Sequence, residues 1–544
     1  METRITSELI EEYVSKNYWL NKSLREYFLE TVKAYPDRDA VADEYKVLNY
    51  QELHDLMENI ISGLHALGVE ARDPIAYQLP NWIEGHAIHN AIRVMDGICC
   101  PIVPIYREKE LKFILNQTEA KVIFIPDVFR KHNYPEVIGN IYSSLPNLEH
   151  VVVLGDTAPK GMITFDEFLD RGKSYKSQKS LQEYKSNPND VGLIMYTSGT
   201  TSEPKGVQHT DNTLIREYLL TIDNFKLDQE TIMLMPSPIT HISGLTPLEL
   251  SLLIGSKVVY MDIWDDTKAA KLISDQKCNF MISATPFLKW LVESDLTEKY
   301  DLSSMQKFVC GGAYIPPELI KKAPNAGIKA VRVYGSTECP TVSLGLLNDS
   351  TERAFYTDGK IPVGYDIKIV SLDGEILSEG QEGEIAVKGP EVFIGYKNTD
   401  LNRESFDHEG YFYTGDLGRI EEERYLVITG RIKDIIIRGG ENISTKEVED
   451  LLYEHPALDQ VAIVAMPDPT LGEKACAYVK VKKGYEFTFD EMISYLSEKK
   501  IARQKLPERL EVLAELPTTT SGKIMKIELR KMIAEKLETN SLQM

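Results

Sequence analysis

Apolar positions follow two spacings that alternate along most of this chain. Residues 53–67 and 82–95 repeat their apolar side chains every three to four positions, which is typical of an amphipathic helix. Residues 74–79, 122–125 and 151–154 form short apolar runs rich in β-branched side chains, and they predict buried strands. Helices and strands that alternate in this way indicate an α/β fold, with layers of helices over largely parallel sheets.

The pattern changes after about residue 433. The elements predicted there are a helix at 445–454, strands at 461–466 and 475–481, a helix at 490–498 and then a polar tail. They form a small α+β unit of ordinary domain size. We therefore predict a large N-terminal domain at 1–432 and a small, mobile C-terminal domain at 433–544, an arrangement that can close over a reaction.

Composition excludes some classes of partner. The chain has 544 residues, a formal net charge of -22 and no basic block. These features argue against nucleic acid or an anionic membrane surface as the main partner. The N-terminus lacks the basic and apolar regions of a signal peptide, and no apolar run reaches the ~18 residues that could span a bilayer. We expect a cytoplasmic protein without integral membrane association.

Six cysteines are scattered along the chain without a CxxC pair or a metal-binding spacing. They are Cys99, Cys100, Cys278, Cys310, Cys339 and Cys476. A chain of this length can bury several cores without disulfides. We therefore expect reduced thiols that behave as small buried apolar groups.

A loop dense in hydrogen-bond donors follows the apolar run at 191–196. Its residues are Thr197, Ser198, Gly199, Thr200, Thr201 and Ser202, with Lys205 at the exit. Backbone N–H groups and hydroxyls in such a loop can surround phosphate oxygens, and Lys205 can add a positive charge. The loop is not a Walker A motif, because no Gly-Lys-Ser/Thr opens a following helix. A polar surface turn is the alternative, but the strand before the loop and the Pro-Lys-Gly exit favour a phosphate site.

Two later strands end in turns that suit a flat ligand. Paired glycines follow the apolar run at 308–310, and glycine lets the backbone approach a ring closely. A tyrosine and another glycine follow the run at 331–333. The residues at these two turns are Gly311, Gly312, Ala313, Tyr334 and Gly335.

Five polar residues on strand exits are candidates for chemistry. Thr337 and Glu338 follow the tyrosine turn, and a carboxylate near anionic phosphates requires a cation between them, for which Mg²⁺ is the oxygen-seeking candidate. Asp416 lies on a glycine-flanked turn and can accept hydrogen bonds from two ribose hydroxyls. Arg431 can reach ribose or phosphate. For His241, which follows the strand at 232–235, a structural role is the alternative.

Together these stretches resemble the signature motifs of the adenylate-forming superfamily, which includes acyl-CoA synthetases, peptide-synthetase adenylation domains and luciferases. The resemblance covers nearly the whole chain, and Ser202 is a departure because the family usually has Gly there. It implies that ATP is bound by the loop 197–205, with adenine against 311–313 and Tyr334. It also implies that Asp416 and Arg431 hold the ribose.

The resemblance assigns further roles to single residues. Glu338 matches the Mg²⁺ ligand, Thr337 contacts phosphate, and His241 lies beside the carboxylate and phosphate of the substrates. Lys523 matches the lysine that swings in to pair with the substrate carboxylate and the α-phosphate. Lys433 matches the hinge, at the boundary that the change of pattern also marks. The turn Gly439-Gly440 matches the loop that lines the pantetheine tunnel.

The implied chemistry has two steps. The carboxylate of an acid attacks the α-phosphorus of ATP and releases pyrophosphate, and the acyl group of the acyl-adenylate then passes to the thiol of CoA or of a carrier-protein phosphopantetheine. A general base is not required, because the acid is already ionised at neutral pH. Catalysis then rests on positioning and charge stabilisation, to which Lys523 contributes. The C-terminal domain rotates between the steps.

The acid pocket implied by the resemblance is neutral and mostly apolar. Its residues are His241, Ile242, Gly244, Pro286, Gly312, Gly335, Thr337 and Pro340. Relatives that activate amino acids have Asp at the position of Ile242, and relatives that bind hydroxybenzoates often have Asn. Ile242 therefore favours a medium-chain, alicyclic or simple aromatic acid, and the stretches around His241 and Gly335 look closest to alicyclic-acid CoA ligases.

Three functions remain open from the sequence. The first is a free-standing acyl-CoA ligase, the second is an adenylating enzyme that loads a separate carrier protein, and the third is a non-catalytic nucleotide-binding module. The intact set of motif residues argues against the third: Lys205, Thr337, Glu338, Asp416, Arg431 and Lys523.

Overall fold

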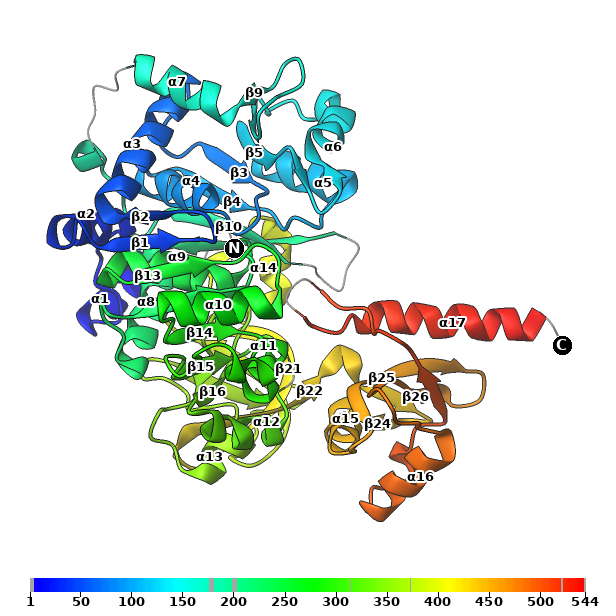
Figure 1. Ribbon diagram of the computed structural model, residues 1–544. Coiled ribbons are helices and arrows are strands. Elements are labelled where there is room, and N and C mark those ends of the chain that lie inside the picture. The colour runs from blue at the N-terminus through cyan, green and yellow to red at the C-terminus, as the bar shows by residue number, and fades with distance from the viewer. Residues whose placement is uncertain are drawn as a thin grey trace.

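Two eight-stranded sheets form the frame of the N-terminal part of the molecule (Figure 1). The computed structural model describes residues 4–175, 181–197, 203–313, 315–371, 373–519 and 522–542. The first sheet has the order β17-β16-β15-β14-β12-β13-β1-β2. Its strands are β1 (Asp39–Ala42), β2 (Val47–Asn49), β12 (Ile232–Met235), β13 (Lys257–Tyr260), β14 (Phe280–Ser283), β15 (Lys307–Cys310), β16 (Lys329–Tyr334) and β17 (Ser343–Leu344).

The second sheet has the order β20-β11-β10-β4-β3-β5-β8-β9. Its strands are β3 (Pro74–Tyr77), β4 (Ile98–Pro101), β5 (Val122–Pro126), β8 (His150–Leu154), β9 (Ile163–Thr164), β10 (Val191–Thr197), β11 (Lys205–Thr210) and β20 (Gly395–Tyr396). A short hairpin, β6 (Val128–Phe129) with β7 (His132–Asn133), follows β5. Most neighbours in both sheets are parallel, as the alternating pattern predicted.

Helices connect these strands. They are α1 (Ser7–Ser15), α2 (Leu24–Ala34), α3 (Tyr50–Ala66), α4 (Ile83–Val94), α5 (Glu108–Thr118), α6 (Tyr134–Ile141), α7 (Phe165–Tyr175), α8 (Asp211–Phe225), α9 (Ile242–Ile254), α10 (Asp266–Gln276), α11 (Thr285–Glu293), α12 (Pro317–Lys322), α13 (Thr351–Tyr356) and α14 (Thr399–Ser405). The predicted helices at 53–67 and 82–95 are α3 and α4. Asn49 and Glu52 form a capping box that fixes the start of α3.

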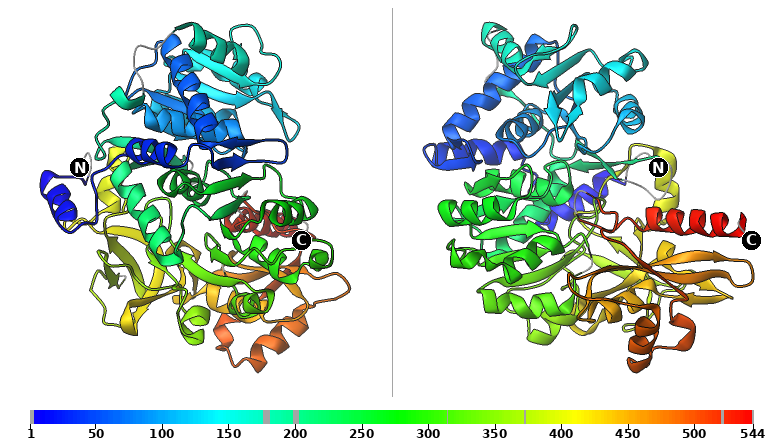
Figure 2. Two further views of the ribbon diagram at one scale, coloured as in Figure 1. Left: turned by 60° about the vertical axis from the view of Figure 1, so that its left-hand side comes forward. Right: turned by 45° about the vertical axis from the view of Figure 1, so that its right-hand side comes forward.

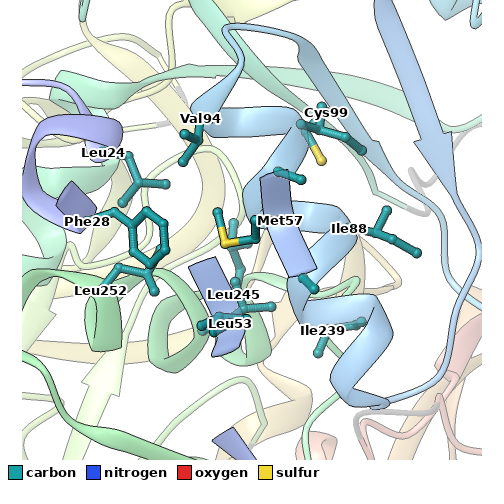
Figure 3. Packing of buried hydrophobic residues seen from close by; sticks show 14 of the residues in the cluster. Leu24, Phe28, Leu53, Met57, Ile88, Val94, Cys99, Ile239, Leu245 and Leu252 are labelled. Atoms are coloured by element: carbon teal, nitrogen blue, oxygen red, sulfur yellow. The ribbon is translucent and has the colours of Figure 1, made fainter. Parts of the chain in front are cut away.

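The largest hydrophobic core lies between the two sheets. One cluster of buried side chains joins α3, α4, α8 and α9 to strands of both sheets, and Figure 3 shows part of its packing. Met57 of α3, Ile88 of α4 and Leu245 of α9 are all fully buried in this cluster. Every residue of α4 except Glu84 is buried, as expected for a helix that is covered on all sides.

A third sheet is formed by the last strands of the N-terminal region. Its strands are β18 (Asp366–Val370), β19 (Gly383–Lys388), β21 (Phe412–Glu421) and β22 (Tyr425–Arg431), all antiparallel. The prediction of largely parallel sheets did not include it. Strands β21 and β22 are half exposed, so their apolar runs are interrupted by polar and glycine residues.

The C-terminal part folds around its own sheet, drawn in orange and brown in Figures 1 and 2. The elements are β23 (Ile436–Arg438), β24 (Glu441–Ile443), α15 (Thr445–Tyr453), β25 (Leu458–Asp468), β26 (Gly472–Val481), α16 (Phe489–Glu498), β27 (Arg509–Val512) and α17 (Lys526–Leu542). The two predicted helices and two predicted strands are present. The predicted fold class, a large α/β part with a small α+β part, is confirmed. The boundary between 432 and 433 stays a prediction.

The predicted polar tail is wrong over its last part. Residues 526–542 form α17, which extends from the side of the molecule (Figure 1). Leu529 and Ile533 are buried against the C-terminal sheet, and Leu537 packs beside them. These three residues are four positions apart and form one narrow stripe on an otherwise charged helix. One apolar residue per turn is too few to predict a helix from the sequence.

Two further expectations can be compared with the structure. All six cysteines are free and buried, as predicted, and burial raises the pKa of the Cys100 thiol to about 12. Across the described ranges no helix is both long and apolar enough to cross a bilayer. The cytoplasmic location stays a prediction.

Candidate functional site

The carboxyl ends of β12, β14, β15 and β16 lie at one edge of the first sheet, because these strands are parallel neighbours. The loops that leave them touch one another. The hydroxyls of Ser237 and Ser283 lie 2.9 Å apart, and the Gly311 amide donates to the Ser283 carbonyl at 3.2 Å. Ligands bind at this edge in open α/β sheets. The topology therefore brings the predicted segments around His241, Pro286, Gly311 and Gly335 together.

Asp416 forms the centre of a preorganised polar group. It lies on β21 opposite Arg431 of β22, and the Arg431 Nε donates to its Oδ1 at 2.5 Å. The Tyr334 hydroxyl donates to Oδ2 at 2.8 Å. Asp416 is buried, and its charge raises the pKa of Arg431. The predicted adenine and ribose residues Tyr334, Asp416 and Arg431 therefore make direct contact with one another.

The turn after β16 is folded tightly. A Cβ added to Gly335 would lie 1.9 Å from the Pro340 carbonyl oxygen, so only glycine fits there. The Ser336 amide donates to the Cys339 carbonyl at 2.9 Å and closes the turn. This geometry holds Thr337 and Glu338 at the end of the strand. Burial lowers the pKa of His209 to about 4, so the ring is neutral and its Nε2 donates to the Thr337 carbonyl at 2.7 Å.

Glu338, the predicted metal ligand, is held by two contacts. The Tyr396 hydroxyl donates to its Oε1 at 2.8 Å, and the Phe393 amide donates to its backbone carbonyl at 2.7 Å. The ammonium of Lys205 lies 5.0 Å from the centre of the Tyr396 ring. Tyr396 therefore connects Glu338 to the exit of the phosphate loop. The sequence did not identify Tyr396.

The phosphate loop connects β10 to β11. Thr197 at the end of β10 is paired with Lys205 at the start of β11, so the loop begins and ends at adjacent positions. A strand, rather than a helix, follows the loop, which agrees with the exclusion of a Walker A motif. The predicted phosphate-binding residues Ser198, Gly199, Thr200 and Thr201 lie outside the described residues.

Four cations gather around this site. Burial lowers the pKa of Lys433, and the positive charges of Lys205 and Arg431 lower it further. Burial also lowers the pKa of Lys523 to about 8, and the charge of Arg431 adds to this effect. Lys433, predicted only as a hinge, is therefore close enough to Lys205, at the exit of the phosphate loop, for the charge of Lys205 to lower its pKa. Mutual repulsion among cations is typical of a site that binds a polyanion.

Lys523 lies on a short hairpin of the C-terminal part. The Thr519 amide donates to the Lys523 carbonyl at 2.8 Å, and the Gly522 amide donates to the Thr519 carbonyl at 2.9 Å. Gly522 has a φ of +81°, and a Cβ added there would lie 3.2 Å from Pro286 of α11. The Lys523 side chain is exposed to solvent at its surface, while the protein around it removes enough water to disfavour its charge.

His241 caps the start of α9. The Ser243 amide donates to its Nδ1 at 3.3 Å. Burial lowers the pKa of His241 to about 4, and the charge of Lys523 contributes. The ring is therefore neutral at pH 7, and with Nδ1 accepting, the proton is assigned to Nε2. His241 can offer this N–H to an anionic oxygen on the side where Lys523 lies.

The walls expected for the acid pocket differ in how tightly they are packed. A Cβ added to Gly244 would lie 2.1 Å from the Pro238 carbonyl oxygen, whereas one added to Gly312, which has a φ of +77°, would meet no atom of the described residues within 4 Å. Behind the wall, two carboxyl groups are buried: the Thr246 hydroxyl donates to Glu217 at 2.8 Å, and the Thr341 amide donates to Glu391 at 3.1 Å.

Burial favours the uncharged form of both carboxyl groups. It raises the pKa of Glu391 to about 8 and raises that of Glu217 well above its ordinary value. In the uncharged form neither group repels an anionic acid in front of the wall. The sequence did not identify either residue as part of this region.

Gly439 and Gly440 form the tip of the β23–β24 hairpin. Both have positive φ values, +59° and +91°, which glycine adopts at little cost. The Gly439 amide donates to the Leu471 carbonyl at 2.8 Å, while both residues are exposed. The structure thus places the predicted pantetheine-contact residues on an exposed tip of the C-terminal part.

Comparison with protein families gives two matches. Residues 28–397 match the model "AMP-binding enzyme", and residues 447–523 match "AMP-binding enzyme C-terminal domain". The chain belongs to the AMP-binding enzyme family. These two matches fall on the large and the small parts of the structure and leave a gap that contains Lys433.

Curated relatives cover nearly the whole chain. A medium-chain fatty-acid–CoA ligase of Escherichia coli is 35% identical over 96% of this chain and 93% of its own length. A putative acyl-CoA synthetase of Bacillus subtilis is 31% identical over 94% and 97%. A 2,3-dihydroxybenzoate–AMP ligase of Bacillus subtilis is 28% identical over 97% of each chain.

Solved structures agree on the fold of this AMP-binding enzyme. An anthranilate–CoA ligase in complex with anthranoyl-AMP has a TM-score of 0.84, with 20% identity over 95% of this chain and 98% of that one. ATP-bound MatB from Rhodopseudomonas palustris has a TM-score of 0.82, with 24% identity over 93% and 98%. At these identities the likeness shows the fold alone.

Proposed function

We propose that this AMP-binding enzyme is an ATP-dependent carboxylate–CoA ligase. The observation that carries the proposal is the group of four cations, Lys205, Arg431, Lys433 and Lys523, around the anchored carboxylate of Asp416. A nucleoside triphosphate supplies both partners for this arrangement. Its ribose hydroxyls can donate to Asp416, and its phosphates can neutralise the cations. The curated CoA ligases that resemble the chain over nearly their whole lengths support the same function.

In the first half-reaction the acid carboxylate attacks the α-phosphorus of ATP, and pyrophosphate leaves. Lys523 stabilises the negative charge that develops on the α-phosphate, and the N–H of His241 orients the attacking carboxylate. Thr337 contacts the same phosphate. Lys205 and the loop that follows Thr197, with Ser198, Gly199, Thr200 and Thr201, hold the departing pyrophosphate.

The residues at Glu338 fit a magnesium ion. Tyr396 occupies Oε1 of Glu338, and the carboxylate has a second oxygen to offer to a cation. Oxygen ligands from one carboxylate together with substrate phosphates are typical of Mg²⁺ in nucleotide sites. When bound, the ion would neutralise charge on the β- and γ-phosphates. The role of this chain is to hold Glu338 in place through Tyr396 and the Phe393 amide.

In the second half-reaction the C-terminal domain, which we assign to 433–544, turns about Lys433. Lys523 then leaves the site, and the Gly439-Gly440 tip is brought to the acyl-adenylate. The thiol of CoA attacks the acyl carbon, and AMP leaves. The exposed position of this tip is consistent with a part of the chain that contacts its partner only after rotation.

The acid is proposed to be a medium-chain, alicyclic or simple aromatic carboxylate. The wall formed by Ile242, Pro286, Gly312, Gly335 and Pro340 carries no charged side chain, and burial raises the pKa of Glu217 and Glu391 behind it, which favours their uncharged forms. A wall of this kind accepts an apolar acid and gives no counter-ion to an α-ammonium group. The name of the Escherichia coli relative points to a medium-chain acid.

Loading of a carrier protein is the second candidate. The dihydroxybenzoate–AMP ligase relatives support it, because their names specify an adenylate as the product. Ile242 argues against a dihydroxybenzoate. The two candidates differ in the thiol and share the first half-reaction.

One experiment tests the proposal. Pyrophosphate release is measured over a panel of fatty, alicyclic and aryl acids, with and without CoA. We expect release with apolar acids, strong stimulation by CoA, and a thioester product. If none of the acids in the panel is turned over, the ligase function is contradicted. Release without a CoA thioester would favour the carrier protein.

A further inference from the structure

Helix α11 meets the C-terminal part of the molecule at two points. Pro286 in its first turn lies against Gly522, the residue before Lys523. One turn later, the Lys289 Nζ lies 2.5 Å from the Oδ1 of Asp459. Residues three apart on a helix share a face. One face of α11 therefore touches both the hairpin that carries Lys523 and the first residues of β25.

Asp459 is held from both sides. Its Oδ2 lies 3.3 Å from the Nζ of Lys480, which is on the neighbouring strand β26. Burial by itself would raise the pKa of Asp459, but the hydrogen bonds and charges of Lys289 and Lys480 outweigh it and lower the pKa. The carboxylate is thus charged, and one of its two cations comes from the other part of the molecule.

We propose that Lys289 and Asp459 form a latch that positions Lys523 for acid activation and opens for thioester formation. This inference rests on the proposed function, because it assumes that the C-terminal domain alternates between two positions. Lys289 and Asp459 are positioning residues: they hold the small domain where the Gly522 turn meets Pro286 and Lys523 comes under the charge of Arg431.

The exposure of the pair suits a latch that must release in every cycle. The side chains of Lys289 and Asp459 are 39% and 23% exposed. Partly exposed ion pairs contribute little, since solvent screens them. After release Asp459 keeps Lys480 as a partner, and Lys289 reaches solvent, so neither charge is left buried without compensation.

The first test separates the two half-reactions in Lys289→Glu. Adenylate formation is measured as acid-dependent pyrophosphate–ATP exchange, and thioester formation is measured from supplied acyl-adenylate and CoA. We expect adenylate formation to fall roughly three- to tenfold, because a favourable contact becomes a repulsive one. Thioester formation should stay the same or rise. Adding Asp459→Lys to the same chain restores opposite charges across the contact and should recover part of the loss, although the new side chain also faces Lys480.

Lys277→Glu is the matched control. Lys277 pairs with Asp301 at 3.0 Å, both residues are exposed, and both belong to the large part of the molecule. This variant has the same change of charge and should leave the ratio of the two half-reactions unchanged. Equal losses in both half-reactions of Lys289→Glu, or no recovery in the double variant, would overturn the latch.

A second measurement does not depend on activity. All native cysteines are buried, so dyes can be attached to cysteines introduced at the exposed positions Lys299, shortly after α11, and Lys483, shortly after β26. Lys289→Glu should lower the energy transfer between them, and the double variant should restore it. Unchanged energy transfer in Lys289→Glu would overturn the latch, whether or not any acid in the panel is turned over. If no acid is turned over but the energy transfer changes as expected, only the proposed function is contradicted.

Discussion

Asp416 and Lys523 are both charged groups of the proposed site, and they are held in opposite ways. Asp416 lies on a strand, is buried, and receives hydrogen bonds from Tyr334 of β16 and from Arg431 of the paired strand β22. Lys523 lies on a hairpin whose described residues hydrogen-bond to one another, and Gly522 of that hairpin lies against Pro286 of the large part.

The difference separates a fixed site from a movable group. The nucleotide needs a carboxylate that is already oriented, because preorganised partners do not have to be arranged during the reaction. The lysine is needed in only one of the two proposed half-reactions. Because Lys523 must leave the site after the first half-reaction, few contacts should hold it to the large part of the molecule. Burial and the charge of Arg431 lower the pKa of Lys523, so the protein around this lysine disfavours its charge.

Replacing Lys523 is expected to give the largest effect. In Lys523→Ala, adenylate formation should fall about 100- to 1000-fold, which is the usual result of removing a donor that stabilises developing charge. Thioester formation from supplied acyl-adenylate should change less than about threefold, since this half-reaction does not use the lysine. Rapid-quench measurement of each half-reaction provides the comparison.

Lys531→Ala is the control for this variant. Lys531 is an exposed residue of α17 in the same small domain, and its removal should affect neither half-reaction. If Lys523→Ala slows both half-reactions equally, the lysine does not leave the site, and the contrast between a fixed carboxylate and a movable cation is wrong.

The pH profile should show the next largest effect. Burial and the charge of Arg431 lower the pKa of Lys523 to about 8, so the closed enzyme loses this charge above pH 8 and keeps it below. The kcat/KM for adenylate formation should therefore fall about tenfold per pH unit above pH 8. Thioester formation should not fall in that range, and ionisation of the CoA thiol should raise it.

Lys523→Arg tests the assignment of this pH dependence. Arginine stays protonated over the whole range, so the fall above pH 8 should disappear, whatever the absolute rate of the variant. A fall that persists in Lys523→Arg would have to come from another group.

The sequence predicted residues at strand ends better than contacts between segments that are distant along the chain. Tyr334, Asp416 and Arg431 stand in short motifs at strand ends. There the residues next to each one in the sequence indicate where it lies in the fold, and the structure brings the three together. Tyr396 contacts Glu338 from 58 positions away along the chain, and Glu217 and Glu391 lie behind the acid wall on separate elements. Such contacts depend on the packing of the complete fold and leave no local pattern.

The same reasoning explains the errors in the fold. The buried parallel strands gave continuous apolar runs and were predicted, whereas the half-exposed antiparallel strands β21 and β22 were not. Helix α17 has one apolar side chain per turn, at Leu529, Ile533 and Leu537, and was read as a tail. In each case the element is covered on one side only, so its sequence shows only part of the apolar pattern from which helices and strands are predicted.

Tyr334→Phe should give the smallest effect and tests the fixed side of the comparison. The variant keeps the ring and removes the hydrogen bond to Asp416, while Arg431 still holds the carboxylate. Loss of one of two hydrogen bonds to a charged group should raise the KM for ATP about three- to tenfold and leave kcat nearly unchanged, as expected for binding that is the same in the ground and transition states. Tyr45→Phe, at a residue that is 86% exposed, is the matched control and should behave as the natural chain. If Tyr334→Phe instead lowers kcat as much as Lys523→Ala does, Asp416 is not anchored independently of the chemistry, and the two regions do not differ in the way proposed.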